Sequence, residues 1–301
     1  MTGSKIAVLL AAYNGMKWID EQIQSVLNQE DISVDIHISV DVSTDSTYEH
    51  CLQLAKQYSN IYILPYGTRY GGAARNFYRL VRDVELANYD FVSFADQDDI
   101  WHLDKLSNAI KVLSEKGYDC YSSNVMAFWE NGKQVLINKA QDQVEYDYCF
   151  ESAGPGCTYV FSKKVALKFQ SFISNNNKDK VDEVELHDWL IYAFARHSGY
   201  KWFIDSWPSM LYRQHSSNQF GANGGLQAAK RRIQMIRNSW YLTEIKRIVN
   251  ILGFENRPFF VNCLNRGYFG HLYIACKIHK VRRKLRDRLS LAVILVLGML
   301  K

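Results

Sequence analysis

Three carboxylates crowd one turn of the chain directly after the apolar run Tyr89 to Ala95; they belong to Asp96, Asp98 and Asp99. Like charges at this spacing repel one another unless a cation compensates them. Carboxylate and phosphate oxygens are the ligands that Mg2+ and Mn2+ prefer, and Mg2+ is usually held by one or two carboxylates plus the phosphates of a substrate. The turn therefore predicts a divalent metal site. The alternative, a helix cap at Asp98 or Asp99, explains one acid and not three.

Two more polar turns follow apolar runs earlier in the chain. The turn at residues 11–15 combines small residues, which permit close backbone approach, with the Tyr13 ring, which can stack on a nucleobase. The turn at residues 39–47 carries Asp41, whose carboxylate can accept the imide N–H of uracil or thymine. Each turn also has a plainer interpretation, as a strand-to-helix turn in the first case and a Ser/Asp helix start in the second.

The segment Thr68 to Asn76 offers a different chemistry. Its glycine pair, Gly71 and Gly72, opens a predicted helix, and arginines stand on either side. The N-terminus of a helix presents free N–H donors to phosphate, so this segment is a candidate for binding a diphosphate. The alternative is a flexible loop whose arginines are solvated.

The elements that must position these residues alternate between short apolar runs and longer amphipathic ones. The predicted strands are Ile6 to Ala11, Asp35 to Val40, Ile61 to Leu64 and Tyr89 to Ala95. The predicted helices are Trp18 to Asn28, Ser46 to Tyr58 and Ala73 to Glu85. This alternation predicts an α/β fold with a doubly wound, mostly parallel sheet, in which ligands bind outside the carboxyl ends of the strands.

The second half of the chain has a looser pattern. After a predicted helix from Leu103 to Ser114, aromatic-rich segments favour mixed or antiparallel strands, and this half is expected to hold an acceptor; the segments are Tyr118 to Phe128, Tyr146 to Phe150 and Thr158 to Phe161. From Leu226 to Leu252 and from Pro258 to Arg288 the sequence becomes helical and basic. We therefore predict a catalytic domain at residues 1–222 and a helical, basic C-terminal region at residues 223–301.

Charge and cysteine content exclude several classes of protein. The formal net charge is +5, and many of the cations fall in the last quarter of the chain, which suits an anionic surface. No nucleic-acid-binding module accompanies them, so a nucleic-acid partner is not expected. The six cysteines form no CxxC pair and are predicted to be reduced core thiols. The N-terminus runs directly into a strand and lacks a signal peptide's long apolar region, which predicts a cytosolic protein.

Taken together, the three polar strand ends resemble the inverting glycosyltransferase family 2, over about residues 5 to 220. The resemblance implies a GT-A fold with a nucleotide sugar lying across the first, second and fourth strand ends. It implies that Ala12 and Tyr13 contact the nucleotide and that Asp41 recognises its base. The family commonly has two consecutive acids where this chain has Val40-Asp41. The resemblance further implies that Asp96 lies on the ribose and metal side, and that Asp98, the last acid of the DxD motif, holds Mg2+ or Mn2+.

The same resemblance assigns roles between and beyond the strand ends. It places Arg75 and Asn76 beside the nucleotide. The segment Gly154 to Thr158 is similar to the family's acceptor-lining segment, so acceptor contacts are expected from Gly156, Cys157, Thr158 and Trp189.

An inverting transfer needs a base for the acceptor hydroxyl proton, and a carboxylate within hydrogen-bond reach suits this task. Asp188 matches the position of the family's catalytic base. Glu185 is a rival candidate, and the plainer interpretation of Asp188 is an N-cap for a helix over Trp189 to Arg196.

The segment Tyr212 to Gly221 resembles a loop of a bacterial polysaccharide subgroup of rhamnosyltransferases. This implies that His215 is a third metal ligand or a diphosphate contact. It also implies that Arg213 offsets charge on the leaving group.

The expected function is therefore inverting, metal-dependent transfer of a sugar onto a lipid-linked oligosaccharide in O-antigen or capsule synthesis. The resemblance suggests dTDP-rhamnose as donor, with UDP-glucose or UDP-galactose as alternatives. A sugar nucleotidyltransferase is a rival class, but it would carry a Gly-rich, Arg/Lys-bearing loop after the first strand. A non-catalytic membrane-associated scaffold is a third class, and it predicts that Asp98 and Asp188 can change without loss.

The C-terminus combines a basic cluster with the apolar run Leu289 to Leu300. The run falls short of the roughly 20 residues that span a bilayer. Each cation near anionic lipid contributes about 1 kcal/mol to binding. We therefore predict a peripheral protein at the cytoplasmic face of the inner membrane. The alternative is a C-terminal helix buried against its own domain or a partner.

Overall fold

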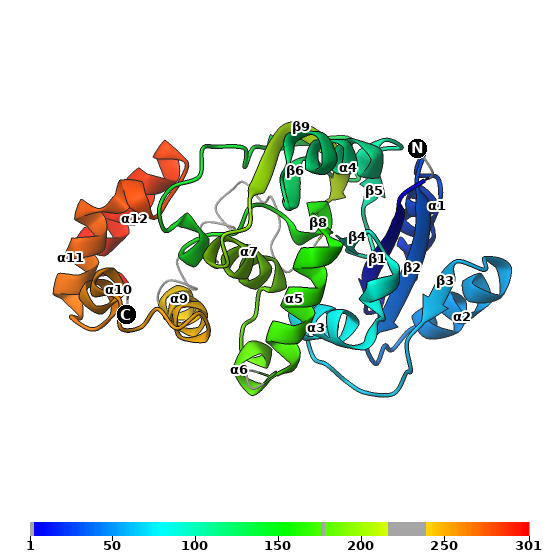
Figure 1. Cartoon of the computed structure of the whole chain (residues 1–301), viewed down its shortest axis with the longest axis horizontal. Helices are drawn as coiled ribbons and strands as arrows, with labels where there is room; N and C mark the ends of the chain where they lie inside the picture. Colours follow the sequence, from blue (N-terminus) through cyan, green and yellow to red (C-terminus); the bar gives the residue numbers. More distant parts are fainter. Residues whose placement is uncertain (1–2, 176–177, 216–238, 301) are drawn as a thin grey trace.

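Mixed strand pairing dominates the architecture of this protein. The computed structural model describes residues 3–175, 178–215 and 239–300. Within these ranges one nine-stranded sheet has the order β3-β2-β1-β4-β8-β6-β9-β5, with β7 paired to β6 (Figure 1). The strands are β1 (Lys5–Ala12), β2 (Ser33–Val40), β3 (Ile61–Ile63), β4 (Phe91–Ala95), β5 (Ile100–Trp101), β6 (Cys120–Phe128), β7 (Gln134–Ile137), β8 (Val160–Ser162) and β9 (Trp202–Arg213).

The helices surround this sheet and form a group of their own at the C-terminus. The first seven are α1 (Ile19–Leu27), α2 (Thr47–Gln57), α3 (Ala73–Asp83), α4 (Lys105–Lys116), α5 (Lys163–Ser174), α6 (Lys178–Asp182) and α7 (His187–His197). The C-terminal group is α9 (Trp240–Ile251), α10 (Pro258–Leu264), α11 (Tyr268–Cys276) and α12 (Leu285–Val296). Short 3-10 turns lie at Leu86–Asn88, Asp147–Cys149, Gly156–Thr158 and Ile278–Lys280.

The N-terminal half is parallel, as the alternating pattern predicts. β1 pairs in parallel with both β2 and β4, so that Ala12 lies opposite Val40 and Leu10 lies opposite Ala95. The carboxyl ends of these strands therefore meet at one edge. The residues of β1 from Ile6 to Leu10 are fully buried, and they alternate between two hydrophobic cores, one shared with α3 and the other with α1. Burial on both faces explains the unbroken apolar run.

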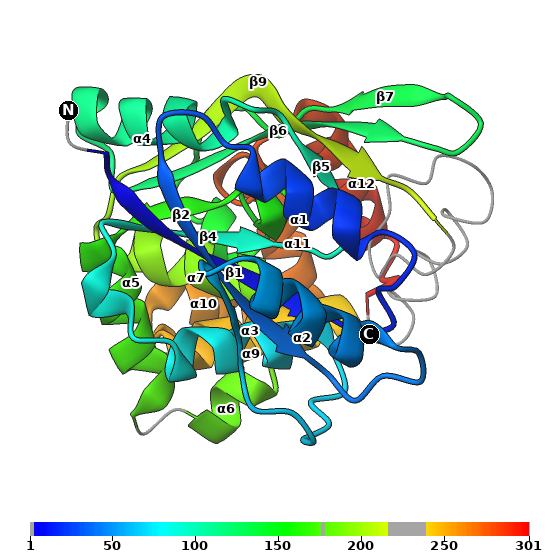
Figure 2. The same cartoon turned by 90° about the vertical axis from the view of Figure 1, so that its right-hand side faces the viewer.

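The second half of the sheet is mixed rather than mostly parallel. β8 is antiparallel to β4 and β6, whereas β6 and β9 are parallel. Figure 2 shows β7 extending beside β6 at the rim of the sheet. The strand expected at Tyr146 to Phe150 is wrong, because residues 147–149 form a 3-10 turn around the buried side chain of Asp147. The strand β9 and the helix α5 were not anticipated.

The C-terminal helices lie at the opposite end of the molecule from α2 and β3 (Figure 1). Apolar residues of α9 to α12 join the core cluster that also contains α5 and α7. The expected helical character is confirmed for the described residues, whereas the predicted boundary at 222/223 and the helix start at Leu226 lie outside them. In α12 one side is buried, at Leu291 and Leu295, and the other is exposed.

Two smaller expectations can be compared with the structure. All six cysteines are free, and five of them are buried, but Cys276 is exposed at the end of α11. Within the ranges that the structure describes, no helix is both long enough and apolar enough to cross a membrane.

Candidate active site

The ends of β1 and β4 are joined by a side chain that the sequence did not single out. Gln97 accepts a hydrogen bond from the Tyr13 backbone N–H at 2.8 Å and donates to the Tyr13 carbonyl oxygen at 2.9 Å. A Cβ added to Gly15 would collide with the Gln97 amide oxygen, so this close approach requires glycine. The Tyr13 side chain remains 46% exposed, which leaves its ring open for stacking.

Asn76 lies beneath this edge rather than on it. The side chain is buried, and its amide group donates to the Ser39 carbonyl oxygen at 2.9 Å and to the Ala12 carbonyl oxygen at 3.4 Å. Its amide oxygen accepts from the Ser39 hydroxyl. Asn76 therefore holds β1 and β2 together, in place of the direct nucleotide contact that the resemblance implied. Ala12 is also buried and offers only its backbone. Arg75 is exposed, and its Nε donates to the Asp182 carbonyl oxygen at 3.0 Å.

Asp41 organises the loop that carries the glycine pair. Its buried carboxylate accepts backbone N–H groups from Val42, Tyr70 and Gly71, each at 2.8 Å. Gly71 has φ +74, a left-handed conformation that favours glycine. A carboxylate can accept about four hydrogen bonds, so Asp41 retains capacity for one further N–H donor.

Asp99 is the most deeply buried acid of the turn after β4, and it does not cap a helix. Its Oδ1 accepts the Arg213 backbone N–H at 3.1 Å, and its Oδ2 is buried without a hydrogen-bond partner. Burial raises the pKa of this carboxyl well above its ordinary value. One ligand atom each from Asp99, Asp96 and Cys157 lie within 4.8 Å of one another. From the sequence, Asp99 was predicted only as one of three acids at a metal site or, alternatively, as a helix cap.

The end of β9 approaches the same turn. His215 Nε2 lies 2.6 Å from Asp98 Oδ2, and the His215 ring stacks on Trp18 at a centroid distance of 4.2 Å. Arg213 Nε donates to the Asp98 carbonyl oxygen at 2.8 Å, and its guanidinium pairs with Glu21. The structure thus brings Asp98 together with Arg213 and His215, which lie 115 and 117 positions later in the sequence.

These residues fit a hard divalent cation. Burial, together with the neighbouring Asp98 carboxylate, raises the pKa of Asp96 to about 7, which shows how poorly the negative charges are compensated without an ion. Most of the donors are carboxylate oxygens, which Mg2+ and Mn2+ prefer, and the imidazole of His215 adds one nitrogen. Burial also raises the pKa of the Cys157 thiol well above its ordinary value, and a soft sulfur ligand suits Mg2+ or Mn2+ less well than carboxylate oxygen does.

Asp188 lies in the first turn of α7, close enough to the acids that its charge contributes to the raised pKa of Asp96. Its Oδ1 accepts the Trp189 backbone N–H at 2.7 Å. Burial raises the pKa of Asp188 to about 6, against the opposing effects of the Trp189 N–H and the Lys139 charge. The rival Glu185 instead accepts the indole N–H of Trp240 at 2.8 Å, so its side chain is directed toward α9.

Gly156 packs directly against the turn that carries Asp188. A Cβ added to Gly156 would lie 2.7 Å from His187 Nε2 and 3.0 Å from the Asp188 Cβ. His187 stacks on Phe77 at 3.9 Å, and burial lowers its pKa to about 3, so the imidazole is neutral. No role was predicted for His187, and Gly156 opposite it was the signal available in the sequence.

The remaining acceptor-side predictions fall on inward-facing side chains. Thr158 donates its hydroxyl to the Pro155 carbonyl oxygen at 2.8 Å, and Trp189 donates its indole N–H to the Tyr148 carbonyl oxygen at 2.9 Å. Cys157, Thr158 and Trp189 are all buried. These side chains therefore support the acceptor segment from within, and Gly156 is the predicted residue that contacts the Asp188 turn.

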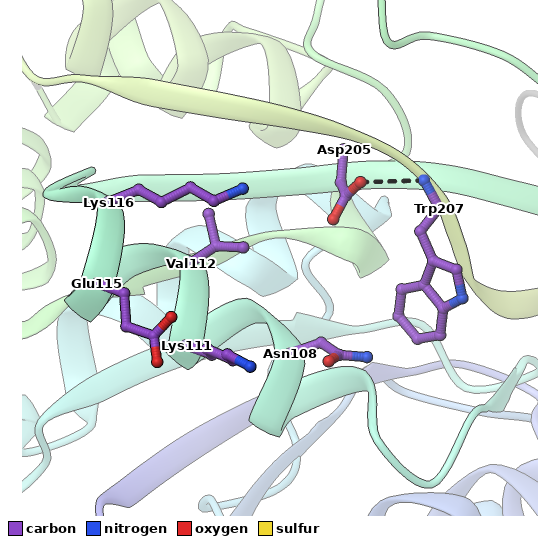
Figure 3. Close-up of a pocket in the computed structure, with 7 residues that line it drawn as sticks. All are labelled: Asn108, Lys111, Val112, Glu115, Lys116, Asp205 and Trp207. Carbon is purple, nitrogen blue, oxygen red and sulfur yellow. Dashed lines mark hydrogen bonds between the residues drawn. The ribbon is translucent and has the colours of Figure 1, made fainter.

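A surface pocket between α4 and β9 is separate from this site. Figure 3 shows its lining, in which Asp205 accepts the Trp207 backbone N–H at 3.0 Å. None of the acids described above lines it. The pocket is therefore lined by residues other than those at the carboxyl ends of β1, β2 and β4, which form the candidate active site.

The family follows from a comparison of sequences. The sequence model of Glycosyl transferase family 2 matches residues 7–170, more than half of the chain. This chain belongs to glycosyl transferase family 2. It is therefore a glycosyltransferase, and the resemblance drawn from the three polar strand ends is confirmed. The matched residues contain the strand ends of β1, β2 and β4 but not Asp188 or His215.

Individual relatives differ in how much of the chain they match. The dTDP-rhamnosyl transferase RfbG of Shigella flexneri is 46% identical over 290 residues, which are 96% of this chain and 99% of the relative. The UDP-Glc:alpha-D-GlcNAc-diphosphoundecaprenol beta-1,3-glucosyltransferase WfgD of Escherichia coli is 24% identical over 56% of this chain and 63% of its own.

Solved structures confirm the GT-A type of fold. Residues 1–349 of S. aureus TarS, in complex with UDP-GlcNAc, superpose with a TM-score of 0.54 at 16% identity, over 98% of this chain and 89% of that chain. The mannosyltransferase PcManGT from Pyrobaculum calidifontis, in complex with GDP-Man and Mn2+, gives 0.55 at 15% identity, over 99% of this chain and 81% of its own. At these identities the likeness is one of fold alone.

Proposed function

We propose that this enzyme transfers rhamnose from dTDP-rhamnose, with inversion, onto a lipid-linked oligosaccharide in surface polysaccharide synthesis. The donor is supported by the 46% identity to the dTDP-rhamnosyl transferase, which extends over 96% of this chain. The chemistry is supported by one observation above the others: the Asp188 carboxyl, whose pKa is about 6, lies within electrostatic reach of the crowded acids after β4.

The donor nucleotide has candidate partners at the strand ends. The half-exposed Tyr13 ring is free to stack on the base, and Asp41 has capacity for the imide N–H of thymine. Uracil carries the same imide, so UDP-glucose and UDP-galactose are the alternative donors.

Asp96 and Asp98, with the imidazole of His215, would hold Mg2+ or Mn2+. When bound, such an ion stabilises the charge that develops on the leaving diphosphate. The chain's own contribution is to fix the ligand set: His215 is held against Asp98 and Trp18, and Arg213 ties the end of β9 to the Asp98 backbone.

Asp188 is the proposed base. With a pKa of about 6 the carboxyl is mostly ionised at neutral pH, and it still has useful basicity. The acceptor oxygen attacks the anomeric carbon and forms the new glycosidic bond while its proton passes to Asp188. The bond from the anomeric carbon to the diphosphate oxygen breaks, and the nucleotide diphosphate leaves on the opposite face of the sugar.

A lipid-linked acceptor places the enzyme at the cytoplasmic face of the inner membrane. Two observations support this part of the proposal. The Escherichia coli relative is named for an acceptor carried on diphosphoundecaprenol. The segment 277–288 of this chain contains seven Lys and Arg residues and a single acid.

The decisive experiment is transfer or hydrolysis of a panel of dTDP-, UDP- and GDP-sugars, with Mn2+ or with EDTA, by the wild type and by Asp98→Ala. Metal-dependent turnover of dTDP-rhamnose that is lost in Asp98→Ala supports the proposal. Turnover of a UDP-sugar alone would move the donor assignment to the alternative. Turnover unaffected by EDTA would refute the metal, and no turnover of any donor would favour the scaffold. Formation of a nucleotide sugar with release of pyrophosphate would indicate a nucleotidyltransferase.

A further inference from the structure

The outer side of α12 carries an apolar stripe that nothing in the described chain covers. Leu285, Leu289, Val293 and Val296 are 67%, 63%, 58% and 50% exposed. Their spacing of four, four and three residues places them on one side of the helix. The opposite side carries Leu291, which belongs to the core. The helix therefore has two apolar sides, one packed in the core and one exposed.

The stripe continues onto α11. The Tyr268 hydroxyl donates to the Val296 carbonyl oxygen at 2.7 Å, which places the start of α11 beside the end of α12. The neighbouring Phe269 is 75% exposed. Contiguous exposed apolar patches on soluble proteins usually mark an interaction surface. We call the set Leu285, Leu289, Val293, Val296 and Phe269 the docking face.

Cations border this face. The Arg286 side chain is 76% exposed and follows Leu285 directly. Lys277, Lys284 and Arg288 precede or interrupt the stripe, and Asp287 is the single acid between residues 277 and 301, whereas Lys280 pairs with Glu145 at 2.6 Å. An apolar stripe edged by cations matches the boundary between headgroups and acyl chains in a bilayer that contains anionic lipid.

We infer that the docking face binds the surface of an anionic bilayer, with its leucine, valine and phenylalanine side chains in the acyl boundary and the bordering cations on lipid phosphates. This deepens the proposed function and rests on it for the lipid-linked nature of the acceptor. A second copy of this chain is the less favourable occupant. It would bring the same cations toward one another across the interface, where like charges repel.

A buried ion network fixes the docking face relative to the catalytic turn. Arg283, two residues before the stripe begins at Leu285, is buried and pairs with Asp147 at 2.8 Å. Its backbone N–H donates to Glu151 at 2.7 Å, and its Nη2 donates to the Ser152 carbonyl oxygen at 2.6 Å. The network thus ties the start of α12 to the segment that precedes the acceptor loop.

The same segment reaches the base. The Ser152 side chain lies near enough to the Asp188 carboxyl to lower its pKa, in opposition to the larger effect of burial. Tyr192, on the same helix as Asp188, donates its hydroxyl to Asp147 at 2.6 Å. When the docking face is bound to the bilayer, the network therefore fixes the distance of Asp188 from the membrane surface. This positions Asp188 to accept the proton of a lipid-linked acceptor hydroxyl.

The test is co-sedimentation of the full chain with phosphatidylcholine vesicles that contain phosphatidylglycerol, compared with phosphatidylcholine alone. The wild type should bind the anionic vesicles more tightly. The double variant Leu289→Asp/Val293→Asp should weaken this binding by at least about tenfold, because two exposed apolar contacts are replaced by anions. Leu103→Asp is the matched control, since Leu103 is a similarly exposed leucine, at 50%, outside the C-terminal helices, and it should bind as the wild type does.

Several results would overturn the inference. The first is that the wild type binds anionic and neutral vesicles equally, and the second is that the double variant binds anionic vesicles as tightly as the wild type. The third is that the wild type is a dimer in sedimentation equilibrium and the double variant is a monomer, which would assign the face to a second copy. Donor hydrolysis in the absence of vesicles separates the two proposals. The double variant should hydrolyse the donor as the wild type does. If the wild type binds vesicles but turns over no donor, the proposed function fails and the docking stands.

Discussion

The donor side and the acceptor side of this site are stabilised in different ways. On the donor side, Asp41 and Gln97 form hydrogen bonds with backbone groups of neighbouring turns. These turns follow the parallel strands of the N-terminal half. On the acceptor side, Asp147 depends on Arg283, which lies 136 positions later in the chain. Asp41 and Gln97 thus find their partners within the first hundred residues, whereas Asp147 on the acceptor side is bound by a residue of the C-terminal region. The two sides should respond differently to substitution.

The largest effect should come from removing the base on the acceptor side. Asp188→Asn should lower kcat by about 10²–10⁴-fold, because the asparagine amide cannot accept the proton of the acceptor hydroxyl. The Kd for the donor nucleotide should be unchanged, since Asp188 lies outside the donor turns. Single-turnover kinetics and calorimetry measure the two quantities. Glu185→Gln is the control and should retain wild-type kcat; a loss in Glu185→Gln with retention in Asp188→Asn would exchange their roles.

The second effect is on stability and tests the long-range network. Arg283→Met should reduce the free energy of unfolding by about 3–5 kcal/mol, because Asp147 and Glu151 are left buried with fewer cations. Urea unfolding gives the value. Arg286→Met is the control, since the Arg286 side chain is 76% exposed and its loss should change stability by less than about 0.5 kcal/mol. Equal effects of the two changes would show that the network does not stabilise the acceptor side.

The pH dependence of kcat should report the ionisation of Asp188 on the acceptor side. The base must be ionised, so kcat at saturating metal and donor should fall about tenfold per pH unit below the Asp188 pKa of about 6 and level off above it. This acid limb should disappear from the residual activity of Asp188→Asn. A limb that persists in this variant would belong to another group.

The smallest effects should come from a matched pair of glycines. Gly15→Ala should push Gln97 away from Tyr13 and raise the donor KM several-fold, with little change in kcat. Gly156→Ala should displace the turn of His187 and Asp188 and lower kcat about tenfold, with the donor KM unchanged. Steady-state kinetics with varied donor resolve both. If both variants changed the same parameter, the division into two sides would fail.

The sequence predicted the donor side well because its signals are local. The apolar strands and amphipathic helices before Ala95 alternate with clear periods, and parallel pairing brings their polar ends together. The positions of Tyr13, Asp41, Asp96 and Asp98 at one edge follow from that topology. What local pattern could not predict was the direction of each side chain, which is why Asn76 was assigned to the nucleotide although it joins β1 to β2.

The acceptor side was harder to predict because its determinants are distant. The segment Tyr146 to Phe150 has the composition of a strand, but the 3-10 turn observed there surrounds Asp147, whose partners come from α7 and from the chain before α12. The strand β9 was missed because Pro208 interrupts it, and the structure shows a register shift at this position beside Asn124. The inward orientation of Cys157 and Trp189 likewise depends on packing that no local pattern encodes.

The Arg283 network has a consequence for the design and the evolution of hybrid enzymes. Residues 147–152 and the chain before α12 share one set of buried charges, so neither can be exchanged alone between relatives without leaving an unmatched ion in the interior. A chimaera that seeks a new acceptor specificity must transplant residues 147–152 together with the tail that contains position 283. The donor turns make no such contact with the C-terminal helices, but Arg213 and His215 bind Asp98, so these two residues must be exchanged together with the donor turns.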